Sequence, residues 1–201
     1  MIVIIDYDSG NLASLKRGLS LAGMETRVSG QIKDIDQASA LVLPGVGAFG
    51  EAMRNLKDSG LIPAIKRHVA NGKPLVGICL GMQLLYETSY EHGTHEGLGF
   101  LKGSVVPIES DYPVPHMGWN KLIFTDASHP LFKYLNMPPY VYFVHSYVVS
   151  TTGDEVLASS DYGQSIPAIV KKDNIMAMQF HPEKSADVGH SLLRALGEMI
   201  A

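Results

Sequence analysis

Cys79 is the residue best suited to covalent chemistry, and it is the one cysteine of the chain. It lies between Gly77 and Gly81, where an apolar strand pattern gives way to a helical pattern over residues 82–87. The G-x-S-x-G turn of hydrolases has the same arrangement, in which a tight strand-to-helix turn strains the nucleophile's backbone and exposes it above the sheet. A helix N-terminus also lowers the pKa of a thiol, and the thiolate is the reactive form. The glycines therefore favour a nucleophile over the more common small buried hydrophobe.

A thiolate nucleophile needs a base that takes and returns a proton, and the best candidate is His181. It ends a predicted strand, and Pro182 stops that strand so that the imidazole lies on a loop. Glu183 follows, where its carboxylate can turn back to one ring nitrogen and stabilise the imidazolium. Alone, this pair would suggest a surface histidine beside a surface acid. It gains weight because His68 and His190 lie within helical patterns, which leaves the cysteine no better partner.

The first half of the chain alternates short apolar runs with amphipathic stretches. Strands are predicted at residues 2–5, near 27–28, at 40–43 and at 74–78, and helical patterns at 12–22 and from 48 to about 69. Continuous apolar strands joined by helices indicate a parallel sheet covered on both faces, because parallel neighbours need crossover connections. We therefore predict an α/β fold with a doubly wound, mostly parallel central sheet flanked by helices.

The second half has a different pattern, with strands predicted at 140–149 and 155–160. Residues 168–170 and 175–178 flank a turn at 171–174 and predict an antiparallel hairpin. A closing helix is predicted over 186–200. We expect an antiparallel extension of the sheet in this half. Because the chain has no repeat, low-complexity tract or long linker, we predict a single domain over residues 1–201.

Composition argues against several classes of function. The net charge is −4 and no Lys/Arg tract is denser than residues 171–172, which argues against nucleic-acid binding. The apolar start at 1–5 is too short for a signal peptide, and no segment approaches the length of a membrane span, so we expect a soluble cytoplasmic protein. His92, His95 and Glu96 have neither a helical register nor a distant third ligand and predict a polar loop. We expect neither a metal nor a cofactor.

Two segments in this order, GICLGMQ at 77–83 and QFHPE at 179–183, closely resemble the class I, triad-type glutamine amidotransferases. The resemblance implies a catalytic triad of Cys79, His181 and Glu183, with a glutamyl thioester on the cysteine. It further implies that Gln83 helps to hold the substrate glutamine. Ammonia would then be released to a synthase partner.

Further segments resemble, within that family, the glutaminase subunits of imidazole glycerol phosphate synthases. They lie at 6–11, 44–50, 115–120 and 142–147, and together cover the chain almost end to end. The resemblance implies a heterodimer with a (β/α)8 cyclase subunit, which uses the ammonia to make imidazole glycerol phosphate and 5-aminoimidazole-4-carboxamide ribotide in histidine biosynthesis. One departure is Asp8, which stands where this family has glycine. Aspartate tolerates positive φ better than most residues, so we expect the turn to survive.

The glycines of residues 45–50 match G-x-G-x-x-G, which alone would suggest a dinucleotide site. The match follows the third predicted strand and lacks a convincing acidic residue at the end of the next one. The resemblance implies instead that this backbone approaches the tetrahedral intermediate, with Val46 or Gly47 and Leu80 as oxyanion donors. Gly47 is also expected to contact glutamine.

The resemblance further implies that Ser146 and Tyr147 line the glutamine pocket with His145, although ordinary strand alternation explains this segment equally well. A loop over residues 115–120 carries the only tryptophan, Trp119. A core anchor is the alternative for that side chain.

The resemblance implies that Trp119 faces the synthase partner, where it and His116 would help to seal the interface. Asn11, Asn120 and Lys184 are further candidates for the partner interface or the ammonia passage, and Lys184 could equally be a solvated lysine.

Three alternatives stay open for the function. The first is a glutaminase subunit of another synthase, anthranilate or aminodeoxychorismate synthase, against which the 115–120 segment argues. The second is a binding homologue without turnover, which the intact cysteine, histidine and glutamate set gives no reason to favour. A cysteine peptidase is the third.

Overall fold

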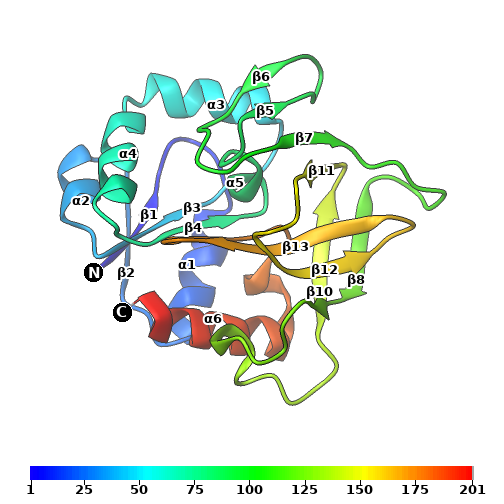
Figure 1. Ribbon diagram of the computed structural model, residues 1–201. Coiled ribbons are helices and arrows are strands. Elements are labelled where there is room, and N and C mark those ends of the chain that lie inside the picture. Colours follow the sequence, from blue (N-terminus) through cyan, green and yellow to red (C-terminus); the bar gives the residue numbers. More distant parts are fainter. Residues whose placement is uncertain (201) are drawn as a thin grey trace.

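The computed structural model describes residues 1–200, and one sheet runs through the middle of the molecule (Figure 1). Ala201, the last residue of the predicted domain, lies outside that range. The strand order is β2-β1-β3-β4-β14-β13-β12-β9. The strands are β1 (Ile2–Ile5), β2 (Thr26–Ser29), β3 (Ala40–Leu43), β4 (Leu75–Ile78), β9 (Ile123–Phe124), β12 (Val156–Asp161), β13 (Ser165–Lys172) and β14 (Ile175–Met178).

The half of this sheet from β2 to β14 is parallel. Its side chains alternate between two separate cores: Ile2 and Ile4 of β1 pack into one, and Val3 and Ile5 into the other. Because both faces are buried, β1, β3 and β4 consist of continuous apolar residues.

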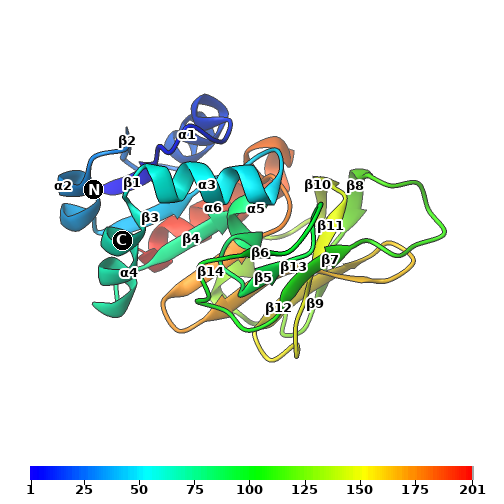
Figure 2. The same cartoon turned by 90° about the horizontal axis from the view of Figure 1, so that it is seen from above.

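Helices cover both faces of the parallel half (Figures 1 and 2). One face is covered by α1 (Leu12–Leu21) and α6 (Ala186–Ile200), and the other by α2 (Ile32–Gln37), α3 (Phe49–Asp58) and α4 (Ile62–Ala70). The short helix α5 (Leu80–Gln83) follows β4 directly. This arrangement confirms the predicted doubly wound α/β fold.

The other half of the sheet is antiparallel, as predicted. The hairpin of β13 and β14 pairs Lys172 with Ile175 and turns at Asp173, which has a φ of 51°. Strand β12 then pairs antiparallel with β13, and β9 with β12.

Two smaller sheets complete this side of the molecule (Figure 2). One is an antiparallel ribbon of β8 (His116–Lys121) and β10 (Tyr140–His145). The other has the order β11 (Tyr147–Ser150), β7 (Ser104–Pro107), β5 (Thr88–Ser89) and β6 (His95–Glu96). Two single-turn 3₁₀ helices are η1 (Pro130–Phe132) and η2 (Pro182–Lys184).

Two predicted helices differ from the structure. The single helix predicted from 48 to about 69 is wrong, because Gly60 adopts a φ of +69° and separates α3 from α4. The helix predicted over 82–87 begins earlier, at Leu80, and ends at Gln83, after which the chain continues in turns.

Two predictions in the second half are also wrong. The strand predicted at 140–149 is two strands, because Ser146 separates β10 and β11, which belong to different sheets. The loop predicted at 115–120 is mostly strand β8, which pairs with β10 along its whole length.

No helix within residues 1–200 is both long enough and apolar enough to cross a bilayer.

Helix α6 packs closely on the segment that contains the candidate base. A Cβ added at Gly189 would lie 1.9 Å from the carbonyl oxygen of Pro182, which is backbone and cannot move aside. A Cβ at Gly197, in the same helix, would meet only the flexible side chain of Met24, at 3.0 Å or more.

We therefore expect Gly189→Ala to lower the free energy of unfolding by about 1–3 kcal/mol, because the methyl group must displace backbone. Gly197→Ala is the matched control and should stay within about 1 kcal/mol of wild type, since alanine favours the helix. Urea unfolding of both variants measures the difference. Equal effects would contradict the close approach at Gly189.

Candidate active site

Cys79 occupies the turn between β4 and α5 and has φ 54° and ψ −115°. Such angles are strained for a residue with a side chain and persist only where the surroundings hold them. Its N–H donates to the carbonyl oxygen of Met178 at 2.8 Å, so β14 fixes the turn from one side. This geometry is that of a nucleophile turn above a parallel sheet.

Three glycines make room for the turn. A Cβ at Gly81 would lie 1.9 Å from the Leu43 carbonyl oxygen, and one at Gly77 would lie 2.9 Å from the Gly81 carbonyl oxygen. A Cβ at Gly45 would lie 2.9 Å from the Gly81 nitrogen. Both glycines that flank the cysteine in the sequence are therefore required by close backbone packing.

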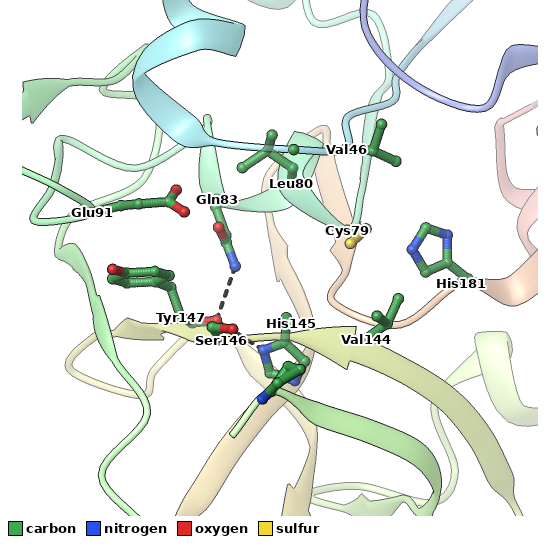
Figure 3. Close-up of a pocket in the computed structure, with 12 residues that line it drawn as sticks. Val46, Cys79, Leu80, Gln83, Glu91, Val144, His145, Ser146, Tyr147 and His181 are labelled. Atoms are coloured by element: carbon green, nitrogen blue, oxygen red, sulfur yellow. Dashed lines mark hydrogen bonds between the residues drawn. The ribbon is translucent and has the colours of Figure 1, made fainter. Parts of the chain in front are cut away.

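His181 and Glu183 are brought together beside the cysteine. The Nδ1 atom of His181 lies 2.9 Å from Oε1 of Glu183, and the two side chains are only 5% and 3% exposed. Figure 3 shows the Cys79 sulfur facing the His181 ring. Burial by itself lowers the pKa of His181, but hydrogen bonds to Cys79 and Glu183, and their charges, outweigh it and raise the pKa to about 9.

Ser185, which no sequence motif pointed to, holds the histidine in place. Its buried hydroxyl donates to the carbonyl oxygen of His181 at 2.6 Å and accepts from the N–H of Tyr142 at 3.0 Å. The N–H of His181 donates to the carbonyl oxygen of Tyr142 at 3.0 Å. Strand β10 thus fixes the loop that carries the base.

A cavity of about 290 Å³ opens over the cysteine (Figure 3). Its size is at the small end of ligand pockets, which suits a single amino acid. The predicted site residues that line it are Val46, Gly47, Cys79, Leu80, Gln83, His145, Ser146, Tyr147 and His181.

Gln83 lies at the end of this cavity away from His181 (Figure 3). Its Nε2 donates to the carbonyl oxygen of Tyr147 and to Oε1 of Gln179, both at 3.0 Å. Both amide hydrogens are therefore used, which leaves the carbonyl oxygen of the side chain as an acceptor for a ligand.

Glu91 also lines the cavity and was not found from the sequence. Its Oε2 accepts from the N–H of Phe49 at 2.7 Å, where α3 begins. The two residues are 42 positions apart, so no local pattern connects them. The carboxylate adds negative charge to the end of the cavity that holds Gln83 and Tyr147 (Figure 3).

The backbone near Val46 is held from the side of β1. The carbonyl oxygen of Val46 accepts from the Ser9 hydroxyl at 3.2 Å, and so the N–H of Gly47, in the same trans peptide, points the opposite way. The neighbouring Asp8 has a φ of 60°, so it adopts the positive φ expected for it. Leu80 opens α5, where N–H groups have no partner inside the helix.

The predicted interface residues lie in two places. Asn11 caps α1 by accepting from the N–H of Ser14, and α1 packs against η2, which contains the exposed Lys184. Trp119 and Asn120 lie on β8, where the tryptophan is 50% exposed.

Trp119 packs edge-on against Tyr142, with ring centroids 6.1 Å apart, and Nδ2 of Asn120 donates to the carbonyl oxygen of Asp161. His116, expected at the interface, is instead fully buried, because residues along a strand alternate between faces.

Comparison with known proteins shows which family the chain belongs to. The family model of class I glutamine amidotransferases matches residues 3–196. Imidazole glycerol phosphate synthase subunit HisH of Oceanobacillus iheyensis is 52% identical, with 100% of both chains covered. The subunit of the same name from Lactococcus lactis is 50% identical, covering 99% of this chain and 98% of its own.

Solved structures agree on the fold at much lower identity. A crystal structure of a glutamine amidotransferase superposes with a TM-score of 0.77 at 20% identity, covering 100% of this chain and 98% of its own. A structure of PurLQS from Thermotoga maritima gives 0.78 at 19% identity, with the same coverage. On the full-length identity and the matched family model, this chain belongs to the class I glutamine amidotransferases, in the HisH family of imidazole glycerol phosphate synthase subunits.

Proposed function

We propose that the chain is the glutaminase subunit of an imidazole glycerol phosphate synthase and that Cys79, His181 and Glu183 form its catalytic triad. The observation that carries the proposal is the strained cysteine facing a histidine that a buried carboxylate holds, inside a cavity of amino-acid size. Family membership supports the same assignment.

Glutamine is bound mainly by groups at the end of the cavity away from His181. Gln83 presents its free Oε1, and Glu91 presents a carboxylate that suits the substrate's α-ammonium group. Ser146 and Tyr147 line the same end, and Gly47, which also lines the cavity, contacts the substrate through its backbone. Together these contacts direct the carboxamide of glutamine toward Cys79.

His181 holds the proton that the thiol gives up, as its pKa of about 9 favours, and the Cys79 sulfur attacks the carboxamide carbon as a thiolate. The oxygen of the tetrahedral intermediate is held by backbone N–H groups of Leu80 and of Val46 or Gly47. Collapse of the intermediate breaks the carbon–nitrogen bond, and the imidazolium returns its proton to the departing nitrogen, which leaves as ammonia. A glutamyl thioester remains on the sulfur.

Water completes the cycle. His181 removes a proton from a water molecule that attacks the thioester, and the thiol is regenerated as glutamate leaves. Glu183 keeps the imidazole in one orientation and stabilises its charged form through both steps.

The partner we propose is a (β/α)8 cyclase that uses the ammonia in histidine biosynthesis, forming a heterodimer. The outer face of the β8–β10 ribbon supports a partner here, since Met117 and Trp119 are 64% and 50% exposed. Met117 is directly opposite Val144, which lines the cavity, so this apolar surface continues to the cavity wall. Asn11, Asn120 and Lys184 stay proposed as interface or passage residues.

Replacing either reacting group should remove glutamate release. We expect Cys79→Ala and His181→Ala to lower kcat for glutamine hydrolysis by on the order of 10⁴-fold or more, because nucleophile and base act as a unit. His190→Ala, which alters an exposed histidine on α6, is the matched control and should retain wild-type activity. Glutamate is measured with the protein alone and with the cyclase loaded with its nucleotide substrate.

Glutamate release that survived the Cys79 substitution would refute the mechanism. Stimulation by a chorismate-using synthase, but not by the cyclase, would assign the subunit to a different enzyme.

The raised pKa of His181 predicts a pH-dependent contribution to stability. Because that pKa is about 9 in the folded protein and about 6.5 in an unfolded chain, protonation of His181 stabilises the fold fully below about pH 6.5. The contribution disappears as the pH rises through 9. Glu183→Gln removes one cause of the raised pKa. The unfolding free energy lost in that variant should therefore be larger at pH 6 than at pH 10, by on the order of 1 kcal/mol.

Urea unfolding at the two pH values and NMR titration of the imidazole measure these effects. Glu25→Gln, an exposed glutamate between α1 and β2, is the control and should show no such difference. A His181 that titrates near pH 6.5 in the wild type would contradict the proposed pairing.

A further inference from the structure

Two histidines of the β8–β10 ribbon form a buried pair beside the cavity, and one of them, His145, lines it. His116 and His145 are directly opposite each other across the two strands, on the face turned away from Trp119. They are 0% and 7% exposed, and Nδ1 of His116 lies 3.0 Å from Nε2 of His145. On its other side, Nδ1 of His145 lies 2.8 Å from the carbonyl oxygen of Tyr147.

This chain of contacts has one consistent assignment of protons for neutral rings. A carbonyl oxygen only accepts, so Nδ1 of His145 must carry a hydrogen and donate to Tyr147. A neutral imidazole has one N–H, so Nε2 of His145 is an acceptor. Nδ1 of His116 must then carry a hydrogen and donate it to Nε2 of His145.

The surroundings favour neutral rings. The His116 ring is stacked between Phe143 and Tyr162, with centroids 4.6 Å and 3.9 Å away. Burial, the largest cause, lowers the pKa of His145 to about 4, and the charge of His181 also acts to lower it. Burial likewise lowers the pKa of His116 against a smaller opposing effect of Asn120.

The acceptor at the end of this chain belongs to the glutamine pocket. The Tyr147 carbonyl oxygen also takes the hydrogen bond from Nε2 of Gln83. The His145 contact closes a ring around Ser146, the single residue between β10 and β11. Two donors on one oxygen thus fix both the pocket wall and the orientation of Gln83.

We propose that His116 is a positioning residue for glutamine binding, which acts through His145 and the Tyr147 carbonyl to hold Gln83 and Ser146 in place. This hydrogen-bonded chain from His116 through His145 to the Tyr147 carbonyl is called the relay below. The proposal rests on the proposed function, because it presupposes that glutamine occupies this cavity. It assigns His116 no contact with the substrate. His116 lies on the same strand, β8, as Trp119, so the relay also connects the exposed ribbon to the pocket.

Packing alone could require a histidine here, and two substitutions separate packing from hydrogen bonding. His116→Phe keeps a ring between Phe143 and Tyr162 but has no donor, which leaves Nε2 of His145 unpaired. His116→Asn loses the ring but places an amide N–H where Nδ1 was. If the relay exists, glutamine affinity should depend on whether the side chain at position 116 can donate a hydrogen bond. The melting temperature should depend instead on whether that side chain has a ring.

Glutamine dissociation constants are measured by calorimetry in a Cys79→Ala background, which removes turnover. His116→Phe should weaken binding about tenfold, the effect of one unfilled buried acceptor, while His116→Asn should stay within about threefold of the parent. Tm should fall more in His116→Asn than in His116→Phe. His68→Phe, which alters a buried histidine bonded to the Pro74 carbonyl oxygen, is the control and should lower Tm without changing glutamine affinity.

NMR of ¹⁵N-labelled histidine tests the proton assignment without any substrate. Both His116 and His145 should be neutral at pH 7 with hydrogen on Nδ1 and none on Nε2. A charged ring, hydrogen on Nε2 of His145, or glutamine affinity that falls with Tm in both variants would overturn the relay. Failure of the proposed function would look different: glutamine would not bind the parent protein, while the tautomers would be unaffected.

Discussion

The strained backbone of Cys79 is the constraint on which the rest of the site depends. A residue with φ 54° and ψ −115° costs about 1–3 kcal/mol, and the surrounding structure must supply that energy. Backbone packs closely on backbone at Gly77 and Gly81, where there is no room for a side chain. The hydrogen bond from the Cys79 N–H to the Met178 carbonyl oxygen adds to this support. Strands β3, β4 and β14 therefore hold the cysteine in the conformation in which its sulfur faces His181.

The two halves of the molecule contribute different parts of the site. The parallel half supplies the cysteine turn and the loop with Val46, at the carboxyl ends of its strands, where open α/β sheets bind ligands. The two smaller sheets on the other side of the molecule supply the wall at Ser146 and, through the contact of strand β10 with Ser185, the position of His181. In the proposed mechanism, glutamine binding and proton transfer therefore depend on the same ribbon that exposes Trp119, and a partner on that surface would lie close to the pocket wall.

Features that follow from local pattern were predictable from the sequence. Buried parallel strands are continuous apolar runs, and the glycines around Cys79 mark a turn that few other residues permit. The break at Ser146 was not predictable, because the chain changes sheets there without proline or glycine. Strands of two residues, such as β5 and β6, are too short to show a period. Glu91 is held by Phe49, which lies 42 positions away, and Ser185 connects the carbonyl oxygen of His181 to Tyr142, which lies 43 positions away. No local pattern encodes these distant partners.

The central claim is that Cys79 attacks the carboxamide of glutamine with the help of His181. Its most direct test is covalent labelling by an electrophilic glutamine analogue, followed by mass spectrometry of the digested protein. We expect one adduct on the peptide containing Cys79, protection by free glutamine, and labelling that slows strongly in His181→Ala but not in His190→Ala. Iodoacetamide, which lacks the glutamine backbone, should show no comparable protection. Labelling that is indifferent to glutamine and to His181, or an adduct on another residue, would contradict the account.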